Sequence, residues 1–203
     1  MPGWSLGSAT LAAPNELTNA TRALPDALIY PMFMSDGWFT KTTLPQHLEM
    51  AGASVRRILP PFGRDARLPD LAADMVRAAA QDAGHRPQQT TLIVAAHGAE
   101  KNPAAARCAR HIADQIARLV PFHEIRLGFL EEPPYLQDAA RIAPDRPAIC
   151  LPLFAAGGAH VARDLPVALT RAGFRGPLLK PIGLQDGVPA LIATALTQPT
   201  ALP

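Results

Sequence analysis

Short apolar runs alternate with amphipathic segments along most of this chain. The apolar runs predict β-strands at 27–32, 54–59, 91–95, 124–130, 148–154 and 178–181. Helical periodicity predicts helices over 44–50, 68–82, 103–119, 135–142, 165–172 and 188–196. Asp164 stands where an N-cap is expected, and Gly173 where a helix should stop. Alternation of this kind is typical of βαβ units on a mostly parallel sheet, so we expect an α/β fold.

An internal repeat divides the chain. Residues 30–52 and 151–173 align without gaps, and 8 of the 23 positions are identical. Similar segments continue on both sides at an offset of about 120 residues. We therefore predict two related parallel-sheet halves, a degenerate first half at 1–88 and a second half at 89–203 that carries the site. The offset aligns Met1 with a position near Phe122. The first half is thus predicted to be truncated at its N-terminus, through degeneration or through a start inside the true reading frame; sequencing the native terminus distinguishes these.

Composition narrows the class of protein. The chain has 203 residues, of which 48% are hydrophobic and 18% charged, as in compact folded proteins. A formal net charge of +2 does not argue for nucleic acid. Cys108 and Cys150 lie outside any CxxC pattern, which favours buried inert thiols. Without an apolar run of about 20 residues or a secretion signal, we expect a cytoplasmic protein that does not contact membranes.

Two histidines fall where open parallel sheets bind ligands, beyond the carboxyl ends of strands. His97 ends the apolar run 92–96, and His160 follows the run at 148–154 through a Gly157-Gly158 loop. Neutral imidazoles from adjacent strand ends bind first-row divalent metals and leave coordination positions open. Glu131 or Glu132 could supply an acidic partner, or form a solvated loop. Asp164 could orient the His160 imidazole instead of capping the helix; the other four histidines are interpreted as structural.

Three motifs resemble the sirohydrochlorin chelatase and CbiX group, the class II chelatases. They are the strand followed by His-Gly at 92–98, Phe-Leu-Glu at 129–131, and the run PLFAAGGAHVARDLP at 152–166. The resemblance implies two flavodoxin-like halves facing each other across a cleft. It also implies insertion of Co²⁺ or Fe²⁺ into sirohydrochlorin or a close precursor, without a nucleotide, for cobalamin or sirohaem. It assigns the metal to His97 and His160, with Glu131 as the candidate carboxylate, and it aligns Phe39 with His160.

A tetrapyrrole with many carboxylates needs cationic partners. The candidates, together with the glycine loop, are Lys101, Arg107, Arg163, Lys41, Lys180, Gly157 and Gly158. A homodimer is a possible assembly, and no phosphate-binding motif supports a nucleotide. Two other functions stay open: a carrier that binds the ring or the metal without turnover, and an interaction domain in which both histidines serve packing.

Overall fold

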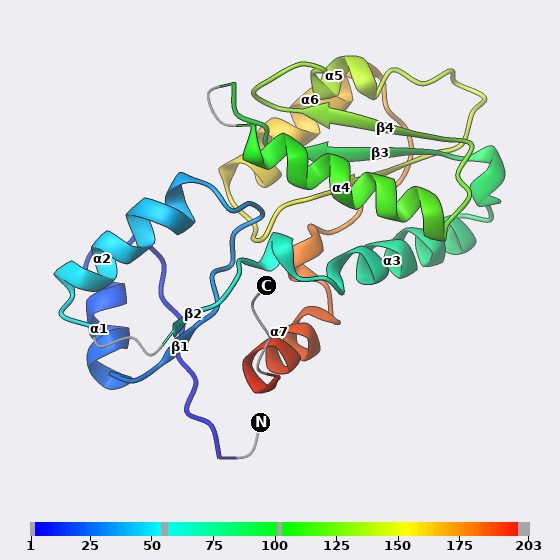
Figure 1. Cartoon of the computed structure of the whole chain (residues 1–203). Helices are drawn as coiled ribbons and strands as arrows, with labels where there is room; N and C mark the ends of the chain where they lie inside the picture. Colours follow the sequence, from blue (N-terminus) through cyan, green and yellow to red (C-terminus); the bar gives the residue numbers. More distant parts are fainter. Residues whose placement is uncertain (1–2, 54–56, 101–102, 199–203) are drawn as a thin grey trace.

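A three-stranded parallel sheet organises the second half of the protein. The computed structural model describes residues 3–53, 57–100 and 103–198. Strand β3 (Thr91–Ala96) lies between β4 (Glu124–Phe129) and β5 (Ala148–Pro152). Strands β3 and β4 run in the same direction (Figure 1), and β5 also pairs with β3 in parallel, so the three carboxyl ends meet at one edge of the sheet, as sequence alternation predicts.

Two helical layers bury this sheet. Helices α3 (Leu68–Asp82) and α4 (Ala104–Leu119) cover one face, while α5 (Leu136–Ala139) and α6 (Leu165–Ala172) cover the other (Figure 1). Successive β3 side chains point to opposite faces, so Leu92 and Val94 join the α3 and α4 core while Ile93 and Ala95 join the other. Every residue of β3 is buried, as expected for a strand covered on both sides.

The first half has a much smaller sheet. Strands β1 (Leu28–Ile29) and β2 (Arg57–Ile58) form one parallel pair beside α2 (Leu44–Met50) (Figure 1). Helix α1 (Glu16–Ala23) precedes them and is not predicted from the sequence; it is short and mostly polar, and Thr21 is its one buried residue. Both strands are shorter than predicted, and residues 54–56 of the second lie outside the described residues.

Local structure recurs between the halves at the spacing of the sequence repeat. A π-helical turn, Phe39–Thr43, leads directly into α2, and a second one, His160–Asp164, leads directly into α6. Further along, the 3₁₀ turns Phe62–Arg64 and Ile182–Leu184 precede α3 and α7 (Val188–Thr197).

One backbone crossing is the same in both halves. Gly63 N donates to Phe33 O and Gly183 N donates to Phe154 O, each at 3.0 Å. A Cβ atom on either glycine would lie within 2 Å of a backbone carbonyl oxygen, 1.8 Å in the first half and 1.9 Å in the second. Only glycine permits the chain to pass so closely, which explains why both halves carry it.

The predicted domain boundary at residue 88 lies between helix α3 and strand β3. Helix α3 precedes that position, yet its buried face joins the core of the second sheet. At its start, Arg67 Nη2 donates to Leu191 O of α7 at 3.1 Å, which ties the two equivalent helices together. The division into 1–88 and 89–203 stays a prediction.

The predicted helices agree with the structure better than the predicted strands. Helices α2, α3 and α6 begin and end where predicted. Besides the two short strands of the first half, two further predictions are wrong in extent: the helix at 135–142 covers only Leu136–Ala139, and the strand at 178–181 is a single bridge from Leu178 to Cys150. Within the described residues, no helix combines the length and the apolar character that crossing a membrane requires.

Candidate metal centre

Three side chains meet at the carboxyl edge of the larger sheet. His97 follows β3 directly, and Glu131 stands two residues after the end of β4. His160 follows β5 through the glycine loop and is the first residue of its π-helical turn. Because β3 lies between β4 and β5, these positions are neighbours in space, as the sequence analysis expects.

The three side chains are close enough to share one ion. His97 Nε2 lies 3.1 Å from His160 Nε2 and 3.5 Å from Glu131 Oε1. One ligand atom from each residue falls within 4.8 Å of the other two, and the imidazole planes are nearly perpendicular at 86°. In the part of the chain that the structure describes, this is the one group of three or more such residues with that spacing.

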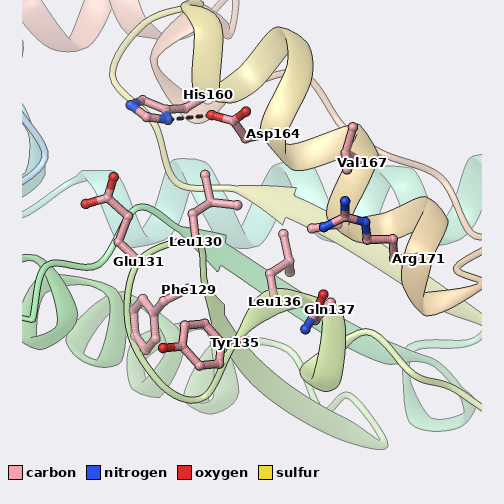
Figure 2. Close-up of a pocket in the computed structure, with 11 residues that line it drawn as sticks. Phe129, Leu130, Glu131, Tyr135, Leu136, Gln137, His160, Asp164, Val167 and Arg171 are labelled. Carbon is pink, nitrogen blue, oxygen red and sulfur yellow. Dashed lines mark hydrogen bonds and ion pairs between the residues drawn. The ribbon is translucent and has the colours of Figure 1, made fainter.

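Hydrogen bonds on the far sides of the rings fix which nitrogen can bind a metal. His97 Nδ1 lies 2.8 Å from Gly98 O, and His160 Nδ1 lies 2.8 Å from Asp164 Oδ2 (Figure 2). A carbonyl or carboxylate oxygen only accepts, so the proton of each neutral ring is assigned to Nδ1. Both Nε2 lone pairs then point toward the same space, where they repel each other unless a cation or a proton lies between them.

The π-helical turn aligns Asp164 with His160. These residues are four apart in the chain, and the turn places both on one side of the helix (Figure 2). Asp164 has helical backbone angles and makes no side-chain capping bond, so its predicted alternative role as an N-cap is wrong. The carboxylate instead orients the imidazole, while Gly173 ends α6 in the left-handed conformation (φ 69°), as predicted.

The loop after β4 separates its two glutamates. Glu132 Oε1 accepts a hydrogen bond from Ala99 N at 2.9 Å, so this carboxylate braces the loop that follows His97. Glu131 is the carboxylate that faces the histidines. Gly98 makes this packing possible, since its φ is +74° and a Cβ atom there would lie 2.8 Å from Glu132 Cγ.

Two cavities of different chemistry flank the histidine pair. The larger, of about 520 Å³, is lined by Glu131, His160 and Asp164, with Arg171 on the same side of α6 (Figure 2). The smaller, of about 240 Å³, contains His97 among apolar side chains of both halves, including Phe33. The larger cavity thus mixes polar groups with apolar and aromatic side chains such as Tyr135, whereas the smaller one is lined mainly by apolar and sulfur-containing side chains.

The predicted substrate-binding residues lie away from these cavities. Those that the structure describes are exposed and absent from both linings: Arg107, Arg163, Gly157, Gly158, Lys41 and Lys180. Lys41 Nζ pairs with Asp36 at 3.1 Å, and Lys101 lies outside the described residues. Arg171, which also lines the larger cavity, is not among the residues predicted from the sequence.

The two cysteines are buried free thiols, as predicted. Burial raises the pKa of Cys108 to about 11 and the pKa of Cys150 to about 12. Thiols with such high pKa values stay protonated near neutral pH, so they are poor metal ligands and nucleophiles.

Solved structures share this architecture. One of them, described as CbiX, the terminal enzyme for biosynthesis of siroheme in denitrifying bacteria, is 47% identical with a TM-score of 0.84, and the match covers 96% of this chain and 83% of that one. SirB from Bacillus subtilis, solved with Fe³⁺, has a TM-score of 0.70 at 15% identity over 93% of this chain and 79% of its own, which shows the fold alone.

Sequence comparisons agree with the structural ones. A curated relative from Halobacterium salinarum, named "Probable sirohydrochlorin cobaltochelatase", is 24% identical in an alignment 172 positions long that covers 73% of this chain. The matched region is 59% of that relative's length. The family model CbiX matches residues 91–198, more than half of the chain, and these residues contain all three members of the histidine and glutamate cluster. The chain therefore belongs to the CbiX family.

Proposed function

We propose that this protein inserts a divalent metal, Co²⁺ or Fe²⁺, into sirohydrochlorin or a closely related tetrapyrrole, without a nucleotide. The observation that carries the proposal is the pair of Nε2 atoms 3.1 Å apart beside the Glu131 carboxylate. The names of two relatives, a siroheme-pathway CbiX and a probable sirohydrochlorin cobaltochelatase, support the same chemistry.

The spacing fits a single ion with open coordination positions. For metal–ligand bonds of about 2.1 Å, two nitrogens 3.1 Å apart subtend roughly 95° at the ion, and a pair 3.5 Å apart subtends roughly 113°. Both angles lie within the range of tetrahedral and octahedral complexes. Three protein ligands on one side of the ion leave the other side for pyrrole nitrogens.

The side chains of the site can accept the protons that metal insertion releases. Insertion of one dication displaces two protons from the pyrrole nitrogens, so the total charge is conserved. As each metal–imidazole bond breaks, the freed Nε2 lone pair of His97 or His160 is a base at the reacting centre. Glu131 is a further proton acceptor, and with 52% of its side chain exposed it can pass a proton to solvent.

The test is insertion of Co²⁺ or Fe²⁺ into sirohydrochlorin, followed anaerobically by the visible spectrum. We expect insertion well above the rate in buffer, and a loss of at least about 100-fold in His97→Ala and His160→Ala. His111→Ala, on the exposed side of α4, is the matched control and should keep the wild-type rate. Comparison of the two metals under the same conditions decides which is preferred.

The other outcomes have separate meanings. Ring binding without faster insertion would overturn the enzyme in favour of the carrier. Binding of neither ring nor metal would favour the interaction domain. Wild-type rates in both histidine variants would show that insertion takes place elsewhere.

A further inference from the structure

Two large aromatic side chains are exposed together on the first half. Trp38 has 59% of its surface exposed and Phe39 has 54%. Their rings contact each other edge to face with centroids 5.4 Å apart, and Phe39 also stacks on Phe33 at 5.9 Å with an interplanar angle of 15°. Adjacent exposed rings of this size usually mark a binding surface.

This aromatic cluster occupies the position of the metal site in the repeat. Phe39 begins the π-helical turn of the first half, as His160 begins that of the second, and both turns are five residues long. The last residue of each turn is Thr43 in one half and Asp164 in the other. One backbone arrangement therefore presents an imidazole with its carboxylate in the second half, and a phenyl ring in the first.

The cluster is also continuous with the histidine site. Phe33 lines the smaller cavity together with His97, and the other side chains there are apolar or sulfur-containing. From this cavity the stacked rings lead outward through Phe39 to Trp38. A flat ligand that reaches the His97 nitrogen from the apolar side would meet this aromatic edge.

We propose that Trp38 and Phe39 form the stacking wall for the tetrapyrrole, so that the first half binds the ring while the second half binds the metal. The inference rests on the proposed function and names the ring-binding surface for it. The occupant is a flat conjugated macrocycle, because stacked aromatic side chains recognise π-faces and the cluster adjoins a cavity that holds a candidate metal ligand.

The test measures binding of metal-free sirohydrochlorin and of Co²⁺ separately in the full chain. We expect Trp38→Ala and Phe39→Ala each to weaken ring binding about 10-fold, with Co²⁺ affinity unchanged. Trp38→Phe should retain most of the ring affinity, since a flat aromatic face remains. Trp4→Ala is the matched control, because Trp4 is the other tryptophan of the chain and is 42% exposed. Thermal unfolding of each variant verifies that it is folded.

The two proposals fail in different ways. Ring affinity in Trp38→Ala equal to that of wild type would overturn the stacking wall, whatever the histidine variants show. Loss of self-association in Trp38→Ala, with unchanged ring binding, would assign the cluster to contact with a second copy of the chain. The stacking wall stands if His160→Ala keeps metal insertion but Trp38→Ala loses ring affinity, although the metal centre would then be refuted.

Discussion

Removal of the Asp164 carboxylate tests whether this group orients the His160 imidazole for metal binding. Partners of this kind usually contribute 10- to 100-fold to metal affinity, by fixing the ring and its tautomer. The hydrogen bond to His160 is short, at 2.8 Å, but 53% of the Asp164 side chain is exposed, so solvent weakens its electrostatic effect. We therefore expect an effect at the lower end of this range: Asp164→Ala should lose about 10-fold in Co²⁺ affinity, which corresponds to about 1.4 kcal/mol of binding free energy.

Asp164→Asn should fall between wild type and alanine. Its amide oxygen still accepts from Nδ1 but lacks the charge, and neutral hydrogen bonds are about half as strong. We expect a loss of about 3-fold. Calorimetric titration with Co²⁺ at fixed pH and ionic strength measures all three proteins. Asp145→Ala, which removes an exposed carboxylate in another loop, is the control for net charge.

A double-mutant cycle excludes a general electrostatic effect. If Asp164 acts through the imidazole, Asp164→Ala should change the remaining Co²⁺ affinity very little once His160 is alanine. An equal loss in both backgrounds would refute the orienting role and show that the carboxylate attracts the ion by charge alone.

Two further predictions concern stability. Gly98→Ala should lower the free energy of unfolding by about 2–4 kcal/mol, because the new side chain would need a left-handed φ and would clash with Glu132 and Phe129. Gly158→Ala is the control: a Cβ atom there meets no neighbour, so the free energy of unfolding should change by less than about 0.5 kcal/mol. Urea unfolding measures both variants. Burial raises the pKa values of Cys108 to about 11 and of Cys150 to about 12, so between pH 9 and 11 the unfolded chain has lost thiol protons that the native chain retains. The stability that comes from the buried neutral thiols is present below pH 9 and falls as the pH rises, so the urea midpoint should decrease between pH 9 and 11. For the same reason, iodoacetamide should label both thiols at pH 8 only after unfolding. Rapid labelling of Cys108 and Cys150 in the native protein would contradict their burial as protonated thiols.

The sequence predicts several helices well, because in them local preference and tertiary packing agree. Helices such as α3 and α6 have an apolar face, a proline in the first turn and a clear end, so the sequence indicates their bounds. The first half is harder to predict in its strands. Its strands have few neighbours to extend them, and β1 and β2 pair over two residues each where six were predicted.

The proximity of His97, Glu131 and His160 could be predicted from the sequence, because strand direction brings the carboxyl ends of neighbouring strands together. His97 and His160 stand at the ends of apolar runs, and any parallel arrangement in which those strands are neighbours brings them together. The sequence could not distinguish the roles of Glu131 and Glu132, since these depend on which carboxylate the Ala99 amide binds. It also could not predict that Arg171 lines a cavity, because the exposed face of a helix depends on the elements that pack against it.

The repeat explains how one scaffold can hold two chemically different partners. A chelatase site has to bind a hydrated dication and a flat apolar ring, and no single set of side chains suits both. Two copies of one π-helical turn allow the tasks to separate, since His160 with Asp164 suits the ion and Phe39 beside Trp38 suits the ring. With Phe39 where the second half has His160, the first turn offers no imidazole that would hold a second cation beside the proposed ring-binding surface. On this argument, the double variant Phe39→His with Thr43→Asp should bind metal-free sirohydrochlorin more weakly than wild type in a spectroscopic titration, even where it gains affinity for Co²⁺.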